Sequence, residues 1–279
     1  MPVKLSRHTL HRHSWGTFAL LLAGAALMLF PFVWMLLSSF KIKADVYAYP
    51  PRWLPSTFHL DNFSKVFELI PFWKYYFNSI YTAVVQTVLQ IALSITAAYA
   101  LTKIPFPGKR LYLRLMTSSL FVPAVVTMIP LYLIVSSLGM VDTYAGIILP
   151  QIVTAFTTML LMSFFESLPD DLIASANIDG CGYLRVLFYV MIPNARGGIA
   201  TATLFSFLGN WKSYTWPLIV TNSTQLRTLP IGLKYLVQES SSEYQVMMAA
   251  AVMAILPVLI VFVFSEKQLV RSITLTGMK

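Results

Sequence analysis

The residues best placed to do chemistry lie in Pro169–Pro193, a polar segment between two hydrophobic runs. Ser167 is positioned to cap a helix opened by Pro169, and Asp170 follows where free N–H groups and the positive dipole end favour a carboxylate. Asp179-Gly180 ends this helix, because glycine tolerates the left-handed conformation, and a second apolar helix is predicted from about Gly182 to Ile192. Such an elbow suits docking onto another protein. The alternative is a helix pair at the membrane interface without a partner.

The sequence contains no ATP-binding motor. Pro107-Gly108-Lys109-Arg110 lacks both the earlier glycine and the Ser or Thr of a phosphate-binding loop. The hydrophobic runs carry almost none of the ionisable groups that ion-driven transporters usually need at bilayer depth. A sodium site built from carbonyls and hydroxyls stays open. Any ATP and magnesium are therefore expected on a separate ATPase polypeptide.

Metal and redox chemistry have little support in the sequence. The single cysteine, Cys181, excludes an internal disulfide and a cysteine-based metal cage. His8, His11 and His13 form a loose tract, which we interpret as part of a solvated anchor at the inner leaflet rather than a metal site. We therefore expect neither a metal nor a cofactor in this chain.

Polar and aromatic residues within the hydrophobic runs are the candidates for binding a solute. Sugar recognition uses aromatic faces and hydrogen-bonding side chains in a cavity. The residues of this kind are Asn210, Trp211, Tyr214 and Trp216, with Gln86, Gln90, Thr96 and Gln151 in other runs. The alternative is structural, since aromatic residues near a membrane end form interfacial belts and buried Gln or Thr side chains join helices.

The composition predicts an all-α integral membrane protein. Hydrophobic residues make up 57% of the 279 positions and charged residues only 11%, against roughly 25% charged in soluble domains. Six apolar runs are long enough to cross the bilayer. They are Trp15–Phe40, Asn78–Leu101, Leu115–Val135, Thr143–Phe165, Ile199–Val220 and Val246–Ser265. Internal prolines at 31, 123, 130, 150 and 257 mean that these runs are not straight unbroken helices.

Basic residues predict the orientation of these runs, because cytoplasmic loops are enriched in Lys and Arg. With both termini inside, the inner segments hold twelve of the 20 basic residues: Lys4, Arg7, Arg12, Lys103, Lys109, Arg110, Arg114, Arg185, Arg196, Lys267, Arg271 and Lys279. The net charge of +9 then reflects topology. Basic and aromatic residues do not interleave as nucleic-acid surfaces require, so we predict no nucleic-acid partner.

The long outer loop, residues 41–77, begins with turn residues and continues into an amphipathic stretch, Leu60–Phe72. We expect this stretch to lie along the outer membrane interface as a membrane-edge helix. Trp73, Tyr75 and Tyr76 would be its aromatic anchors.

The elbow resembles the cytoplasmic "EAA" loop of ABC importer permeases, whose pattern is E-A-A-x-x-x-G-x9-I-x-L-P. Ala174-Ser175-Ala176 stand at E-A-A, Gly180 stands at the glycine, and Val190, Ile192 and Pro193 close the motif. The motif's glutamate is Ala174 here, so a salt bridge from that glutamate to the ATPase is not carried over. By this resemblance, the ATPase-coupling residues are Asp170, Asp171, Ala174, Ser175, Ala176, Asp179, Gly180, Cys181 and Arg185.

The resemblance extends over nearly the whole chain, through AAYALTKIPFPGK, LGMVDTYAGIILP and GNWKSYTWPLIV to the C-terminal LTGMK. These segments resemble the second permease subunit of carbohydrate ABC importers, although Lys212-Ser213 departs from the residues that commonly follow the fifth-span Trp. The resemblance implies the type I importer permease fold. It has a cytoplasmic segment, 1–14, and a six-helix transmembrane domain, 15–279, with coupling loop 166–198.

The resemblance also implies partners in the inner membrane: a second permease subunit, two ATPase subunits carrying ATP and magnesium, an extracytoplasmic solute-binding protein and the lipid bilayer. The expected function is to form half of the path for a sugar or sugar-like solute. The alternatives are an ABC permease for a non-sugar solute, such as a phosphodiester or polyamine, and a non-ABC channel or scaffold.

Overall fold

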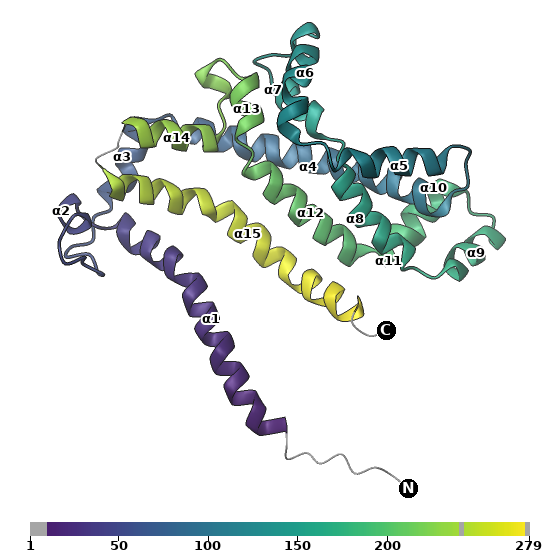
Figure 1. The fold of residues 1–279 in the computed structure, drawn as a ribbon, viewed down its shortest axis with the longest axis horizontal. Coiled ribbons are helices and arrows are strands. Elements are labelled where there is room, and N and C mark those ends of the chain that lie inside the picture. The colour runs from purple at the N-terminus through teal and green to yellow at the C-terminus, as the bar shows by residue number, and fades with distance from the viewer. Residues whose placement is uncertain (1–9, 240–242, 277–279) are drawn as a thin grey trace. The chain divides into compact units, whose positions relative to one another are not determined.

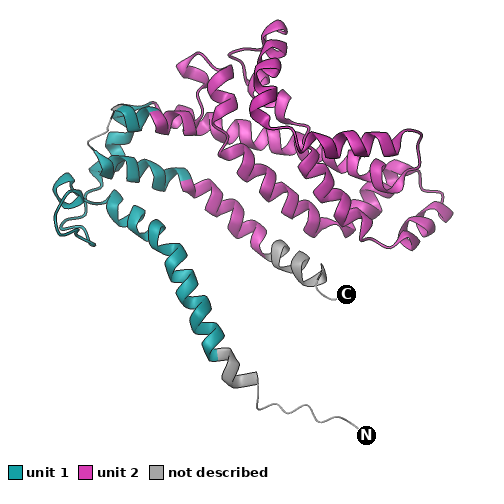
Figure 2. Cartoon of the chain, in the orientation of Figure 1, with its two compact units in different colours: residues 1–70, 235–254 teal, residues 71–234, 255–279 magenta. Residues whose placement is uncertain are grey.

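The computed structural model describes residues 10–239 and 243–276. Residues 1–9 of the predicted segment 1–14, with His8, lie outside the described part, and the division at residue 14 stays a prediction. Across the described residues the chain is all helical, without a strand (Figure 1). The all-α prediction is confirmed to that extent. Figure 2 separates two compact units, residues 1–70 with 235–254 and residues 71–234 with 255–279.

Three helices are long and apolar enough to span a membrane unaided. These spans are Trp15–Ser39 within α1 (Leu10–Ser39), α4 (Phe72–Lys103), and Tyr244–Glu266 within α15 (Tyr244–Thr276). Two bent helix pairs raise the number to five if each pair is one span. The prediction of several membrane-spanning helices is therefore confirmed, but the predicted number of six is not.

The third predicted run is broken, as its internal prolines predict. The chain forms α5 (Lys109–Ser119) and α6 (Ala124–Ser137), which are bent by 107° relative to each other. Pro123 is the physical cause, because proline has no N–H for the helix ladder and disfavours helical geometry in the residue before it. By contrast, Pro31, Pro130 and Pro257 lie inside continuous helices.

The fourth and fifth predicted runs are also interrupted. The fourth consists of α7 (Tyr144–Ile148), the short η1 turn (Leu149–Gln151) and α8 (Ala155–Glu166), with a bend of 45° between its halves. The fifth divides into α12 (Arg196–Trp211) and α13 (Thr215–Val220). The break falls at exposed Lys212, whose charge favours solvent over a buried helical turn.

Short elements complete the described chain. They are α2 (Lys43–Val46), α3 (Asp61–Leu69), α9 (Asp170–Ile178), α10 (Tyr183–Arg185), the π-helical η2 (Val186–Met191), α11 (Ile192–Asn194), η3 (Thr224–Leu226) and α14 (Leu229–Glu239).

In the second unit, α4 packs against α8 and α12 (Figure 1). Buried residues recur along α4 every three or four positions, so one face of the helix is covered over most of its length. The buried face is largely polar from Asn78 to Gln90, with Thr82 and Gln86 between them. Its last turns are apolar and join a core cluster with α8, α9, η2 and α12.

Polar clips fix the loops at the other end of α4. Asn78 donates to the carbonyl oxygens of Gln225 and Arg227, both at 2.8 Å. Asp142, which has a left-handed backbone (φ 58°), accepts the N–H groups of Asn222 and Ser223, both at 2.9 Å. The bond from the Ser223 N–H is the main reason that the pKa of the Asp142 carboxyl lies below its usual value. These clips hold the loop after α13 in place.

The predicted interfacial stretch Leu60–Phe72 is divided between the two units. Its helical part is α3, and Phe72 already belongs to α4. Of the three proposed aromatic anchors, Trp73 is exposed, but Tyr75 is buried. Tyr76 packs edge-on against Trp211, with ring centroids 5.8 Å apart. Tyr75 and Tyr76 are thus packing residues of the second unit, because the start of α4 turns them inward.

Candidate functional site

The elbow contains a tightly closed helix end at Gly180. Gly180 has φ 76°, and its N–H donates to the Asn177 carbonyl at 3.1 Å. The Cys181 N–H donates to the Ala176 carbonyl at 2.9 Å, which completes a Schellman motif. Ala176 and Cys181 both join the apolar core cluster. The predicted glycine helix end is therefore confirmed, down to the bonds that require a left-handed residue.

The predicted cap at Ser167 is wrong. The Ser167 hydroxyl donates back to the Phe164 carbonyl at 2.7 Å, so it completes the end of α8 instead. Pro169 occupies the N-cap position of α9, and no side chain caps that helix. Asp170 and Asp171 do lie in its first turn, where carboxylates complement the helix dipole.

The second half of the elbow also differs from its prediction. The helix begins at Tyr183 but does not end before Pro193, because α10 continues through the π-helical η2 into α11. Pro193 therefore lies inside the helical stretch, directly after the π-helical turn η2, and a local π adjustment is one way in which a helix accommodates the missing N–H of a proline. The elbow is thus helically continuous almost to α12.

Three helices hold the elbow in place. Core residues of η2 pack in one apolar cluster with Phe165 of α8, Ala202 of α12 and Tyr99 of α4. Lys103, the last residue of α4, reaches α9 directly: its Nζ lies 2.6 Å from Asp170 Oδ1 and 3.2 Å from the Leu168 carbonyl. The Lys103 side chain is only 10% exposed. Sequence inspection missed this tie, because the pair is separated by 67 positions.

The outward surface of the elbow is apolar in part. Ile178 is 86% exposed, and Tyr183 and Leu184 are also well exposed. Among the predicted coupling residues, the exposed ones are Asp170, Asp171, Ala174, Ser175, Asp179, Gly180 and Arg185. Ala176 is buried and Cys181 is half-buried, so these two support the fold of the elbow. The elbow therefore offers a partner a surface that the described part of the chain leaves uncovered.

Four of the predicted solute-path residues meet at one cavity. Gln86 and Gln90 of α4, Gln151 of η1 and Asn210 of α12 line a cavity of about 270 Å³. The other lining residues, which the sequence analysis did not single out, are Thr154, Phe156, Thr157, Phe205, Ser206, Gly209 and Ser213. None of the lining residues is ionisable. The volume of this cavity is slightly below that of the smallest typical ligand pockets, which is roughly 300 Å³.

Hydrogen bonds divide the polar residues of this cavity into two groups. Gln90 Nε2 donates to Thr154 Oγ1 at 2.7 Å and to Thr157 Oγ1 at 3.0 Å, and Gln90 Oε1 accepts from Asn210 Nδ2 at 3.2 Å. This network joins α4, α8 and α12, as the structural alternative expects. Within the described part of the chain, Gln86 and Gln151 have no side-chain hydrogen-bond partner, so their amide groups are available to a solute.

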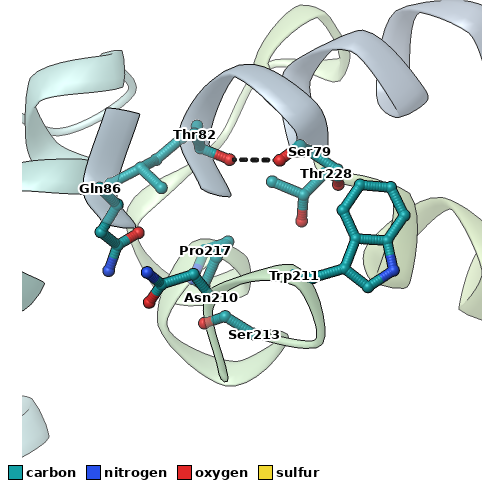
Figure 3. A pocket seen from close by; sticks show the side chains of 9 residues that line it. Ser79, Thr82, Gln86, Asn210, Trp211, Ser213, Pro217 and Thr228 are labelled. Atoms are coloured by element: carbon teal, nitrogen blue, oxygen red, sulfur yellow. Dashed lines mark hydrogen bonds between the residues drawn. The ribbon is translucent and has the colours of Figure 1, made fainter. Parts of the chain in front are cut away.

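A second, much smaller cavity adjoins Gln86 and Asn210 (Figure 3). Its volume is about 10 Å³, enough for about one water molecule. Trp211 lines it from one side, and the Thr228 hydroxyl, buried without a hydrogen-bond partner in the described chain, points into it (Figure 3). Of these two cavities, the larger one approaches the size that a sugar needs.

The remaining aromatic and polar candidates lie elsewhere. Tyr214 does not line either cavity, and its ring lies 5.5 Å from Lys234 Nζ. Trp216 is buried and donates to the Gly146 carbonyl at 3.1 Å. Thr96 lines a separate cavity between α4, α5 and α8. Sequence spacing did not show that Tyr214 and Trp216 lie away from the cavity that Gln86 lines. The helix breaks at Lys212, and the chain changes direction after Trp211.

Comparison with known proteins identifies the family. Residues 90–275 match the family described as binding-protein-dependent transport system inner membrane component. The chain belongs to this family. The permease is therefore a multi-pass membrane transport subunit and not an enzyme, as predicted, and a non-ABC channel or scaffold is set aside.

Curated relatives match over most of their length. The permease is 34% identical to the sulfoquinovosyl glycerol transport system permease protein SmoH of Agrobacterium fabrum, over 90% of this chain and 89% of that one. It is 32% identical to the arabinooligosaccharides transport system permease protein AraQ of Bacillus subtilis, over 91% of each. It is 29% identical to the sn-glycerol-3-phosphate transport system permease protein UgpE of Escherichia coli, over 91% of this chain and 93% of that one.

A solved structure shows the same fold. A chain of a bacterial ABC transporter involved in import of the acidic polysaccharide alginate superposes with a TM-score of 0.80 and 26% identity. The match covers 96% of this chain and 99% of the other. The permease therefore has the fold of an ABC importer permease, as the sequence predicted.

Proposed function

We propose that this permease forms half of the membrane path of an ATP-driven importer for a neutral sugar or sugar-like solute. It pairs with a second permease subunit, two ATPase subunits that carry ATP and magnesium, and an extracytoplasmic solute-binding protein. Residues 15–279 form six spans in the inner membrane, with both termini and the coupling loop 166–198 on the cytoplasmic side. Alternating access, driven by the ATPases, moves the solute.

The elbow carries this proposal. Its uncovered apolar surface around Ile178, Tyr183 and Leu184 offers an ATPase subunit a hydrophobic contact. Its inner side is bonded to α4 and packed against α8 and α12. A displacement of the elbow by a docked ATPase therefore moves the cytoplasmic ends of three helices together. Ala174 contributes no charge at this surface, so the contact depends on apolar burial and on the neighbouring carboxylates.

The lining of the larger cavity favours a neutral, hydroxyl-rich solute. Amide groups of Gln86 and Gln151 match sugar hydroxyls as donors and acceptors, and the rings of Phe156 and Phe205 offer apolar faces. A phosphodiester or a polyamine would need an opposite charge, which the lining lacks. The relatedness to the sn-glycerol-3-phosphate permease keeps a phosphate ester as the second candidate.

Removing the two available amides tests the solute path. In the assembled importer, Gln86→Leu and Gln151→Leu are each expected to raise the KM for uptake roughly two- to twelvefold, because one neutral hydrogen bond contributes about 0.5–1.5 kcal/mol. Binding-protein-stimulated ATP hydrolysis is expected to persist. Gln238→Leu, at an exposed site in α14, is the control. Unchanged uptake kinetics in both cavity variants would exclude this cavity from the path.

Chemical labelling tests the proposed orientation. Cys181 is the single cysteine and lies on the coupling loop, half-buried. An impermeant maleimide is expected to label it only after spheroplasts are permeabilised. Thr224→Cys, at an exposed site in η3, is expected to react in intact spheroplasts and serves as the control. Labelling of Cys181 in intact spheroplasts would reverse the topology.

A further inference from the structure

The segment Tyr47–Phe58, which we call the aromatic loop, presents large apolar side chains after the end of α1. Tyr49 is 97% exposed, and Trp53, Leu54 and Phe58 are also mostly exposed. Side chains of this kind are costly to leave in water, so a partner is expected to cover them. The proposed function of the elbow and cavity does not use this loop.

Polar contacts hold the loop in one shape. Lys41 is fully buried, and its Nζ donates to the Arg52 carbonyl at 2.7 Å while lying 3.8 Å from the centre of the Trp34 ring. Asp45 accepts the Arg52 guanidinium at 2.8 Å and the Ser56 hydroxyl at 2.6 Å. The hydrogen bond from the Ser56 hydroxyl is the largest cause that keeps the pKa of the Asp45 carboxyl below its usual value, and the bond from the Ser56 backbone N–H is the second. The loop is therefore a preorganised surface.

The loop folds back along the membrane-spanning part of α1. The Trp53 ring packs edge-on against Phe30 and Trp34, with centroid separations of 5.8 and 5.4 Å. Phe30 and Trp34 lie inside the candidate span Trp15–Ser39, nine and five residues before its end. At 1.5 Å per residue, these positions are about 13 and 7 Å from the end of the helix. The Trp53 ring therefore lies beside the last turns of this candidate span.

We infer that the aromatic loop is a lipid-binding surface that enters the bilayer interface at the end of α1 and takes phospholipid as its partner. Its apolar side chains continue the exposed apolar surface of α1, since Leu29, Phe30 and Val33 are also exposed. Trp and Tyr rings favour this level of a membrane. Exposed Lys43 offers a positive charge to phosphate groups, and the exposed part of the Arg52 guanidinium, which is paired with Asp45, offers further N–H donors.

Depth-dependent quenching of tryptophan tests this inference. The assembled importer is placed in nanodiscs whose lipids carry bromine either near the headgroup end or near the middle of the acyl chain. The difference in tryptophan fluorescence between the wild type and Trp53→Phe is the contribution of Trp53, which we call its share. Phenylalanine keeps an aromatic ring in contact with Phe30 and Trp34. We expect shallow bromine to quench this share at least twice as strongly as deep bromine. We expect aqueous iodide to quench it weakly.

A matched control and a second variant complete the test. The share of Trp216, defined by Trp216→Phe, is expected to resist both brominated lipids, because Trp216 is buried and hydrogen-bonded. Leu54→Trp in the Trp53→Phe background restores a reporter at a neighbouring exposed site and is expected to restore shallow quenching. Iodide quenching of both reporters without lipid quenching would place the loop in water and overturn the inference. Protection from iodide only on addition of the binding protein would assign the loop to that protein instead.

Discussion

Gly180→Val is expected to abolish solute uptake while the chain still inserts into the membrane. Gly180 has φ 76°, a conformation that costs a β-branched residue on the order of 1–2 kcal/mol. Relief of that strain breaks the bonds to Asn177 and Ala176 and tilts α9 relative to η2. Measurements of uptake, of ATPase co-purification and of binding-protein-stimulated ATP hydrolysis should all show the loss.

The structure selects the controls for this variant. Gly182 lies two residues away in the same elbow, has φ −74° and has no neighbour within 4 Å of an added Cβ, so Gly182→Val is expected to transport. Gly139→Val carries similar strain, φ 67°, in a turn outside the elbow. Gly198 is unsuitable as a control, because a Cβ there would collide with the Phe164 ring. Wild-type transport by Gly180→Val would show that the elbow does not couple the ATPase to the spans.

Lys103→Glu is expected to uncouple transport from ATP hydrolysis. The variant replaces the ion pair with Asp170 by two carboxylates and removes the donor to the Leu168 carbonyl. Solvent screening at exposed Asp170 limits the contribution of this ion pair to about 1 kcal/mol, so uptake should fall roughly fivefold. Basal ATP hydrolysis by the partner subunits should continue, and its stimulation by the binding protein should drop.

Charge swapping separates coupling from general damage to the fold. Lys103→Arg is expected to preserve uptake, and the double variant Lys103→Glu with Asp170→Lys is expected to recover much of it. Arg114→Glu makes the same charge change at an exposed site of α5 that has no ion pair in the described chain, so it should leave uptake near the wild-type rate. Equal losses in Lys103→Glu and in the double variant would mean that the ion pair does not transmit the movement.

Local sequence patterns determined the membrane class and the helix end at Gly180. Long apolar runs leave no other stable arrangement than helices in lipid, because every backbone polar group must bond within its own segment. Likewise, glycine is the residue that occupies the left-handed position of a Schellman turn at no steric cost, so Asp179-Gly180 marks the end of α9 without knowledge of the tertiary fold.

Tertiary structure alone decided which polar residues meet. Gln86, Gln151 and Asn210 come from three separate segments, and they share a cavity because α4 packs against α8 and α12. The tie from Lys103 to Asp170 joins residues 67 positions apart, and no local pattern encodes such a contact. The breaks at Pro123 and Lys212 have local causes, but whether proline kinks or divides a helix depends on its neighbours: Pro130 and Pro257 remain inside helices.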